Sequence, residues 1–264
     1  MIRPLLALLL LSAAAPALAK GREFCPDRPG LGTPPCIIDT GRIAVETSLA
    51  DWTLERDAET RTDMILAGDL LVRLGVADHA EIQIGWTAYG HVRTRDRASD
   101  AVSRTARTGD VMLAVRRSLM NPDGSGPSLA LMPFVTLPVG RMPVGYGDWG
   151  AGLIVPMRFD LSDAISLGLS PEIDAAVDED GDGRHLAYGS VIGLSADLSD
   201  AVSASIELSA MRDLDPGAHA TETLAGLSLG WQPREDLQFD IGTNVGLNRD
   251  SADVEVYAGL SRRF

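Results

Sequence analysis

Aromatic residues and cysteine are scarce in this chain, and no long apolar run occurs after residue 19. Aromatic residues make up 5% of the 264 residues, and there are two cysteines. Beyond residue 19, Gly, Asp, Arg or Pro interrupts every apolar stretch within about ten residues, whereas a membrane-spanning helix needs about 20. The mature chain is therefore either soluble or crosses a membrane as strands.

Basic charge is also in short supply. Lys and Arg number 23 against 37 Asp and Glu, which gives a formal net charge of −14. Nucleic acids bind through clustered basic residues, so a chain this acidic is a poor partner for them. We expect no nucleic-acid partner, and no motif in the sequence calls for a cofactor.

The N-terminus supplies the one apolar run. Arg3 is followed by a leucine-rich stretch over 5–11, and Ala17 and Ala19 offer a small-x-small cleavage site. This pattern is typical of a secretory signal peptide over residues 1–19. The alternative, a membrane anchor, is disfavoured because the run is too short to span a bilayer.

From residue 41 to residue 264 the chain alternates apolar and polar residues in stretches of strand length. Ile82, Ile84 and Trp86, for example, alternate with Glu81 and Gln83. A helix requires apolar residues three and four apart, and these stretches do not sustain that spacing. The pattern predicts about 12 strands joined at hairpin spacing.

Short and longer breaks alternate between these stretches. The short breaks fall at 76–80, 161–165, 198–202 and 233–237. The longer ones fall at 95–108, 138–147, 178–184, 212–220 and 248–251. Two breaks depart from this order, because 56–60 is short on the long side and 121–127 is long on the short side. Tight turns at one rim and long loops at the other predict an antiparallel up-and-down transmembrane β-barrel. A soluble β-sandwich is the alternative.

Three prolines lie inside predicted strands. Pro133, Pro156 and Pro171 each lack the N–H that a strand ladder needs. Each marks either a bulge or a locally open seam, so the pattern leaves the strand count between residues 121 and 175 open.

The last predicted strand, 254–264, indicates where the protein resides. Its apolar residues share one face, its polar residues share the other, and it ends on Phe264. Such a strand resembles the assembly signal of bacterial outer-membrane barrels. It predicts an outer-membrane location, with membrane lipid and the barrel-assembly machinery as partners through Phe264.

The inward face of the predicted barrel carries charge. In this register the lumen-facing candidates are Glu46, Asp63, Asp69, Arg73, Glu81, Asp110, Arg116, Arg158, Glu172, Asp174, Glu207, Glu222, Asp240 and Glu255. Side chains nearly fill a barrel of this size, so these charges must pair or meet water. The lining indicates either a narrow, cation-tolerant conduit or an ion-pair network that stiffens the wall.

Cys25 and Cys36 lie in a segment rich in proline and glycine, 20–40, that precedes the barrel. An exported chain meets an oxidising compartment, so we expect the two cysteines to form a disulfide. A metal site is the weaker alternative, because only Asp27 lies between them as a further ligand. The segment is either a lumen plug or a periplasmic extension.

Two short motifs suggest chemistry. Asp178, Asp180 and Asp182 match the first half of a calcium loop, but Gly189 stands where the closing glutamate belongs, so at most a weak metal site is expected. The string 226–230 fits the G-x-S-x-G pattern of hydrolases around Ser228. A nucleophile elbow needs a strand, a turn and a helix, whereas this string lies within a strand pattern, so we expect no catalytic residue and no enzyme.

Several segments resemble one bacterial family. They are DRPG at 27–30, PP at 34–35, GRIAVE at 41–46 and VYAGLSRRF at 256–264. These segments, with the repeated Leu-Ser-Asp turns, are similar to the outer-membrane transporter family labelled "putative MetA-pathway of phenol degradation". The resemblance implies a barrel that passes small solutes, aromatic compounds among them. A non-conducting structural or surface-binding barrel and, less favoured, an outer-membrane lipase are the alternatives.

Overall fold

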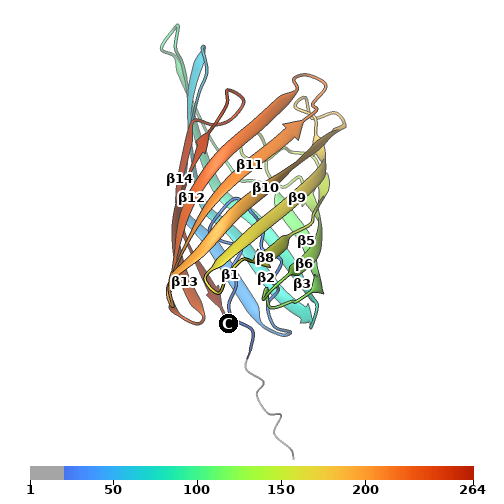
Figure 1. The fold of residues 1–264 in the computed structure, drawn as a ribbon. Helices are drawn as coiled ribbons and strands as arrows, with labels where there is room; N and C mark the ends of the chain where they lie inside the picture. The colour runs from blue at the N-terminus through green and yellow to red at the C-terminus, as the bar shows by residue number, and fades with distance from the viewer. Residues whose placement is uncertain (1–20) are drawn as a thin grey trace, which may run out of the picture.

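The computed structural model describes residues 21–264, so the predicted signal peptide at 1–19 lies outside the described residues. The described chain forms a barrel of antiparallel strands (Figure 1). Its strands are β1 (Ile43–Arg56), β2 (Thr60–Ala77), β3 (Ala80–Asp96), β4 (Val102–Arg107), β5 (Val111–Met120), β6 (Ser128–Leu137), β7 (Gly150–Ile154), β8 (Met157–Asp160), β9 (Ile165–Val177), β10 (Arg184–Ser199), β11 (Val202–Asp213), β12 (Ala220–Arg234), β13 (Leu237–Gly246) and β14 (Val254–Arg263).

Fourteen strand segments make twelve barrel strands, because two strands are each interrupted once. β4 and β5 both pair with β3, and β7 and β8 both pair with β6 and β9. The barrel closes where β14 pairs with β1, and the N–H of Phe264 donates to the carbonyl of Ile43 at 2.7 Å. The predicted count of about 12 strands is confirmed.

The prolines explain one of the interruptions. Pro156 separates β7 from β8, and its carbonyl accepts a hydrogen bond from the N–H of Ala130 at 2.9 Å. Pro171 stays within β9, where its carbonyl accepts from the N–H of Val155 at 2.9 Å. Pro133 stays within β6 opposite Leu153. One proline therefore opens a gap in a strand, and the other two leave their strands continuous.

Burial in the wall is inverted relative to a soluble protein. Glu81 and Gln83 on β3 are fully buried, whereas Ile82 and Ile84 between them are 40% and 46% exposed. The described residues contain no helix that could cross a membrane. An apolar outside around a polar inside is the arrangement of a barrel in lipid, and it rules out the sandwich alternative.

The two rims differ as the spacing predicts. The short-turn rim holds the turns 78–79, 161–164, 200–201 and 235–236, and the chain from residue 21 and the C-terminus lie at this end (Figure 1). The long-loop rim holds the loops 138–149, 178–183, 214–219 and 247–253.

One predicted loop was wrong. Residues 95–108 are largely strand, because β3 continues to Asp96 and β4 starts at Val102, leaving 97–101 as the turn. The end of β3 and β4 pair at six positions, from Gly90 with Arg107 to Arg95 with Val102. They form a hairpin that projects beyond the rim (Figure 1). Its polar composition suggested a loop, but a hairpin outside the membrane needs no apolar face.

Candidate functional site

The segment 21–42 runs inside the barrel, against the inward face of the wall. Its contacts reach β1, β2, β5, β9, β11, β13 and β14 through side chains of the wall. We call residues 22–39 the inner segment. Because it touches strands on opposite sides of the barrel, its position decides how much of the lumen is open.

Arg73 of β2 is the centre of the first attachment. Its guanidinium lies 3.1 Å from Glu46, 3.0 Å from Glu81 and 3.0 Å from Asp27 of the inner segment. The Arg73, Glu46 and Glu81 side chains are fully buried. A buried arginine is stable only when its charge and its donors are matched, and three carboxylates supply that match here.

Asp27 links this cluster to a second arginine. Its carboxylate lies 2.5 Å from Arg116 of β5, and Gln83 donates to it at 3.4 Å. Burial raises the pKa of the Asp27 carboxyl, but Arg116 and Arg73 more than offset that effect, so the pKa lies below its ordinary value. Asp27 is therefore ionised at neutral pH and pins the inner segment to β2 and β5.

Backbone N–H groups of the inner segment make the second attachment. Leu31 and Gly32 donate to Glu207 of β11 at 2.7 and 3.0 Å. Thr33 donates to Ser170 of β9 at 3.0 Å. A side chain at Gly30 would collide with the Glu207 carboxylate, and Gly30 also has a φ of 117°, so glycine suits this close approach.

The third attachment is an ion pair to β13. Arg28 lies 2.9 Å from Asp240 of β13, and its guanidinium stands 5.4 Å from the ring centre of Tyr257 on β14. The Tyr257 hydroxyl accepts the N–H of Gly30 at 3.1 Å. A planar guanidinium suits both a carboxylate and an aromatic face, so lysine would not replace Arg28 fully.

A disulfide joins Cys25 to Cys36 and closes the inner segment into a loop. Arg73 reaches both ends of that loop, since it donates to the carbonyl of Cys25 at 2.8 Å and to that of Cys36 at 3.2 Å. The disulfide and the hydrogen bonds of Arg73 therefore hold the same two residues together.

A cavity of about 800 Å³ remains between the inner segment and the wall. Asp27, Arg28 and Thr33 line one side of it. The wall side is rich in small residues, beside larger ones such as Glu207 and Gln238: Gly168, Ser170, Gly193, Ser195, Ser203, Ser205, Ser228 and Gly230. These small residues leave room for a small solute, and their hydroxyl groups can replace part of a solute's hydration.

The other predicted lumen residues form separate groups. Asp110, between β4 and β5, accepts the N–H groups of Gly140 and Tyr146 at 2.8 and 2.6 Å and so holds the loop 138–149. Asp69 accepts from Thr87 at 2.8 Å. Arg158 pairs with its neighbour Asp160 at 3.1 Å beside the cavity.

Four acids lie toward the long-loop rim, away from the Arg73 cluster. Glu172 and Asp174 follow Ser170 on the inward face of β9, and Asp174 occupies the space that the missing side chain of Gly152 leaves. Glu222 lies two residues into β12, and Glu255, near the start of β14, accepts from Asn244 at 2.7 Å.

Asp63 lies on the other face of β2 from Asp69. Gly68 between them has a φ of 66°, which breaks the alternation of the strand. On the N-terminal side of Gly68, Ile65 is 44% exposed and therefore faces outward. Asp63, two residues from Ile65, lies on the same outer face. There Asp63 pairs with Arg61 at 2.9 Å and with Arg93 at 3.5 Å.

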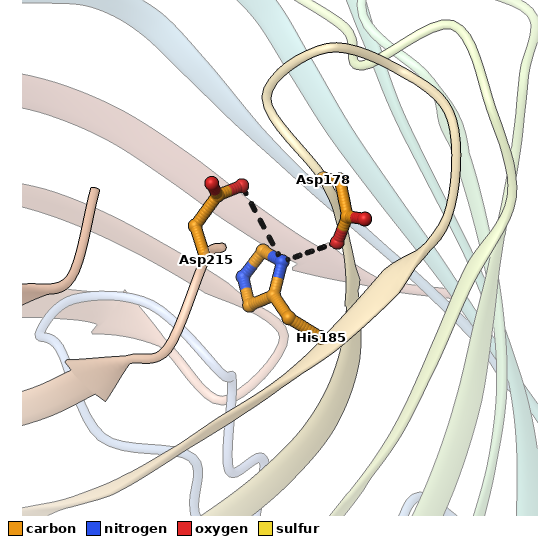
Figure 2. Close-up of side chains that lie close together, drawn as sticks. All are labelled: Asp178, His185 and Asp215. Atoms are coloured by element: carbon orange, nitrogen blue, oxygen red, sulfur yellow. Dashed lines mark hydrogen bonds and ion pairs between the residues drawn. The ribbon is translucent and has the colours of Figure 1, made fainter. Parts of the chain in front are cut away.

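The structure separates the three aspartates of the calcium-like string. Asp180 and Asp182 lie in the exposed turn of the loop 178–183, where Asp180 accepts the N–H of Asp182 at 2.9 Å. Asp178 instead meets His185 of β10 and Asp215 of the loop 214–219 (Figure 2). Sequence reasoning missed both partners, since they come from two hairpins and neither belongs to the string.

Ser228 of the G-x-S-x-G string lies within β12, and its hydroxyl shares a 2.6 Å hydrogen bond with Ser205 of β11. No turn or helix follows it, so the string lacks the strand–turn–helix context of a nucleophile elbow. Here Ser228 is part of the cavity wall.

A closed twelve-stranded barrel with a charged interior and an apolar exterior defines an outer-membrane β-barrel. The family model described as "Putative MetA-pathway of phenol degradation" matches residues 26–264. The chain belongs to that family. The match includes the inner segment as well as the wall.

Solved structures share the fold at low identity. The COG4313 outer membrane channel from Pseudomonas putida F1 matches with a TM-score of 0.68 at 14% identity, over 87% of this chain and 97% of that one. The NanC porin matches with a TM-score of 0.52 at 9% identity, over 83% and 98%. The KdgM porin in complex with disordered oligogalacturonate gives 0.51 at 9% identity, over 81% and 98%. No curated protein matches the chain.

Proposed function

We propose that this protein is a passive outer-membrane channel for small solutes, narrowed by its inner segment. The observation that carries the proposal is the cavity of about 800 Å³ between that segment and a wall rich in serine and glycine. The fold is shared with a protein described as an outer membrane channel and with two porins. A polar passage beside a fixed constriction suits diffusion without a bound cofactor.

Two neighbouring residues of β11 provide a matched test of the passage. Ser205 lines the cavity, whereas Ile206 is 58% exposed on the outer face. In planar bilayers, Ser205→Trp is expected to lower single-channel conductance severalfold, because the indole fills the passage. Ile206→Trp is expected to conduct like the parent protein, since its side chain stays in lipid. Equal conductance of the two variants would place the passage elsewhere.

We propose small aromatic cations as the favoured solutes. The family description supports aromatic compounds, and the acids Glu172, Asp174 and Glu222 toward the long-loop rim favour positive charge. Liposome swelling with phenethylamine and with phenylacetate compares two solutes of similar size and opposite charge. We expect faster swelling with the amine, and equal rates would contradict the charge preference.

A barrel that does not conduct at rest is the second candidate. The fully buried Arg73 cluster favours it, because a segment held by buried ion pairs does not move readily. Under this alternative the parent protein shows no conductance in bilayers, and a variant with a loosened inner segment does.

We also propose that the protein is not an enzyme. Ser228 is held in a strand by its hydrogen bond to Ser205, without the turn that exposes a nucleophile. A refolded sample is expected to show no esterase or phospholipase activity. Activity in the parent protein that Ser228→Ala removes would overturn this proposal.

A further inference from the structure

Three metal-ligating side chains meet at the long-loop rim, outside the passage described above. Asp178 is the first residue of the β9–β10 loop. His185 lies at the start of β10, and Asp215 belongs to the β11–β12 loop. Figure 2 shows the imidazole of His185 between the two carboxylates. Their ligand atoms all lie within 4.8 Å of one another.

The histidine is buried and surrounded by oxygen atoms. Its side chain is 5% exposed, and its Nδ1 lies 2.9 Å from Asp178 Oδ1 and 3.5 Å from Asp215 Oδ2. Its Nε2 lies 2.8 Å from Asp213 Oδ1 but is not aligned for a hydrogen bond. A deeply buried polar atom without a hydrogen bond is uncommon in folded proteins.

Backbone groups hold Asp215 in place. Its carboxylate accepts the N–H of Glu179 at 2.7 Å and that of Gly217 at 2.6 Å. Gly183 leaves the space that the Asp178 carboxylate occupies, because a side chain there would collide with it. The carboxylates are therefore positioned before any ligand binds.

We propose that Asp178, His185 and Asp215 form a Zn²⁺ site that joins the β9–β10 and β11–β12 loops. Zinc takes nitrogen and oxygen ligands at about 2.0–2.2 Å in a tetrahedron, which puts neighbouring ligand atoms about 3.3 Å apart. The observed separations of 2.9 and 3.5 Å from Nδ1 bracket that distance.

The remaining positions of the site are also supplied. A cavity of about 290 Å³ adjoins the cluster and is lined by both carboxylate ligands, so a water molecule has room to complete the tetrahedron. Asp213 lies next to the other nitrogen of His185, where a second-shell carboxylate fixes the ring orientation of a metal-bound histidine.

The ligand set favours zinc over calcium. Calcium takes six to eight oxygen ligands, whereas this cluster offers an imidazole nitrogen and few oxygens. Asp180 and Asp182, which the calcium-like string would need, lie in the exposed turn and are not in the group of three whose ligand atoms lie within 4.8 Å of one another.

Isothermal titration of the refolded full-length protein with Zn²⁺ in detergent tests the site. We expect one ion per chain, with affinity lowered at least tenfold in Asp178→Asn, His185→Gln and Asp215→Asn. Asp213→Asn is expected to cost about tenfold to a hundredfold, as a second-shell change. His219→Gln and Asp182→Asn are the matched controls, because they lie in the same two loops but outside the cluster and its adjoining cavity, and they should bind like the parent protein.

Co²⁺ substitution supplies a second readout that does not depend on affinity alone. A nitrogen–oxygen tetrahedron gives Co²⁺ an intense visible band, which we expect in the parent protein and not in His185→Gln. The heat-modifiable mobility of the barrel on gels verifies that each variant is folded. Absence of stoichiometric Zn²⁺ binding, unchanged binding in folded His185→Gln, or Ca²⁺ binding that requires Asp180 would each overturn the proposal.

Discussion

At the scale of single residues, Arg73 carries the largest concentration of opposite charge in the lumen. It reaches Glu46, Glu81 and Asp27 at 3.0–3.1 Å with no solvent access. Desolvating these charges is costly, so the cluster by itself says little about net stability. What it does fix is the position of the inner segment, since Asp27 pairs with Arg73 of β2 and Arg116 of β5 at once.

Replacing Arg73 with methionine should destabilise the barrel strongly. Glu46 would stay buried without its cation and Glu81 would keep only Arg116, and breaking a buried pair in this way typically costs about 3–5 kcal/mol. Urea unfolding in detergent, followed by tryptophan fluorescence, measures the loss. Adding Glu46→Gln and Glu81→Gln to Arg73→Met should recover part of it. The control, Arg61→Ala, removes an exposed pair with Asp63 and should have a much smaller effect that added salt screens. Equal losses in both arginine variants would show that burial of the cluster does not matter.

Asp27 should make the inner segment sensitive to acid. Its folded-state pKa lies below the ordinary value because Arg116 and Arg73 outweigh its burial. The stabilisation is therefore complete above the unfolded-state pKa of about 3.9 and is lost as the pH falls through the lower folded-state value. We expect conductance to change below about pH 4. Asp27→Asn should show the acid-like conductance at pH 7.

The acid response must be separated from that of neighbouring groups. Glu46 of β1 pairs with Arg73, and Glu81 of β3 pairs with Arg73 and Arg116, so both carboxylates contact the arginines that hold Asp27. An exposed acid, Asp180, serves as the control, because Asp180→Asn should keep the parent profile. An Asp27→Asn variant with an unchanged acid transition would assign the transition to the glutamates.

At the scale of elements, alternation along each strand allowed the barrel to be predicted, since the pattern is local. The departures came from features that alternation does not encode. The positive φ of Gly68 moves Asp63 to the opposite face, and the polar β3–β4 hairpin extends into a stretch that composition assigns to a loop.

The contacts of the inner segment could not be predicted from the sequence, because the residues that meet are far apart in the chain. Arg28 and Asp240 are 212 residues apart, and Leu31 and Glu207 are 176 apart. Nothing local at either position indicates its partner. Alternation predicted a set of acids on the inward face, but it could not indicate that a preceding segment supplies Asp27 and Arg28, which pair with lining side chains.

The disulfide of the inner segment should restrain the passage. A disulfide typically stabilises the folded state by about 2–4 kcal/mol, because it restricts the conformations of the unfolded chain. The double variant Cys25→Ser with Cys36→Ser is expected to show larger or noisier single-channel currents, because residues 26–35 gain freedom. Reducing agent should have the same effect on the parent protein and none on the double variant. Currents that are identical with and without the disulfide would show that the ion pairs alone hold the segment.

At the scale of the whole molecule, charge is distributed unevenly along the barrel axis. The lumen arginines Arg28, Arg73 and Arg116 lie where the inner segment attaches, and each is paired with a carboxylate. Toward the long-loop rim, Glu172 and Asp174 have no arginine among their ion-pair partners in the described chain from residue 21 onward. The half of the lumen that a solute meets first from the long-loop rim is therefore the more negative half.

This asymmetry predicts cation selectivity that depends on the rim acids rather than on net charge. Under a KCl gradient, the reversal potential of the parent channel should indicate preference for K⁺, because carboxylates without cations repel anions from the mouth. Glu172→Gln combined with Asp174→Asn should move the permeability ratio toward unity. Asp236→Asn removes one negative charge from a short turn outside the lumen, where it pairs with Arg234, and should leave the ratio unchanged. If both changes shifted the ratio equally, selectivity would follow the overall charge of −14 and not the lining of the mouth.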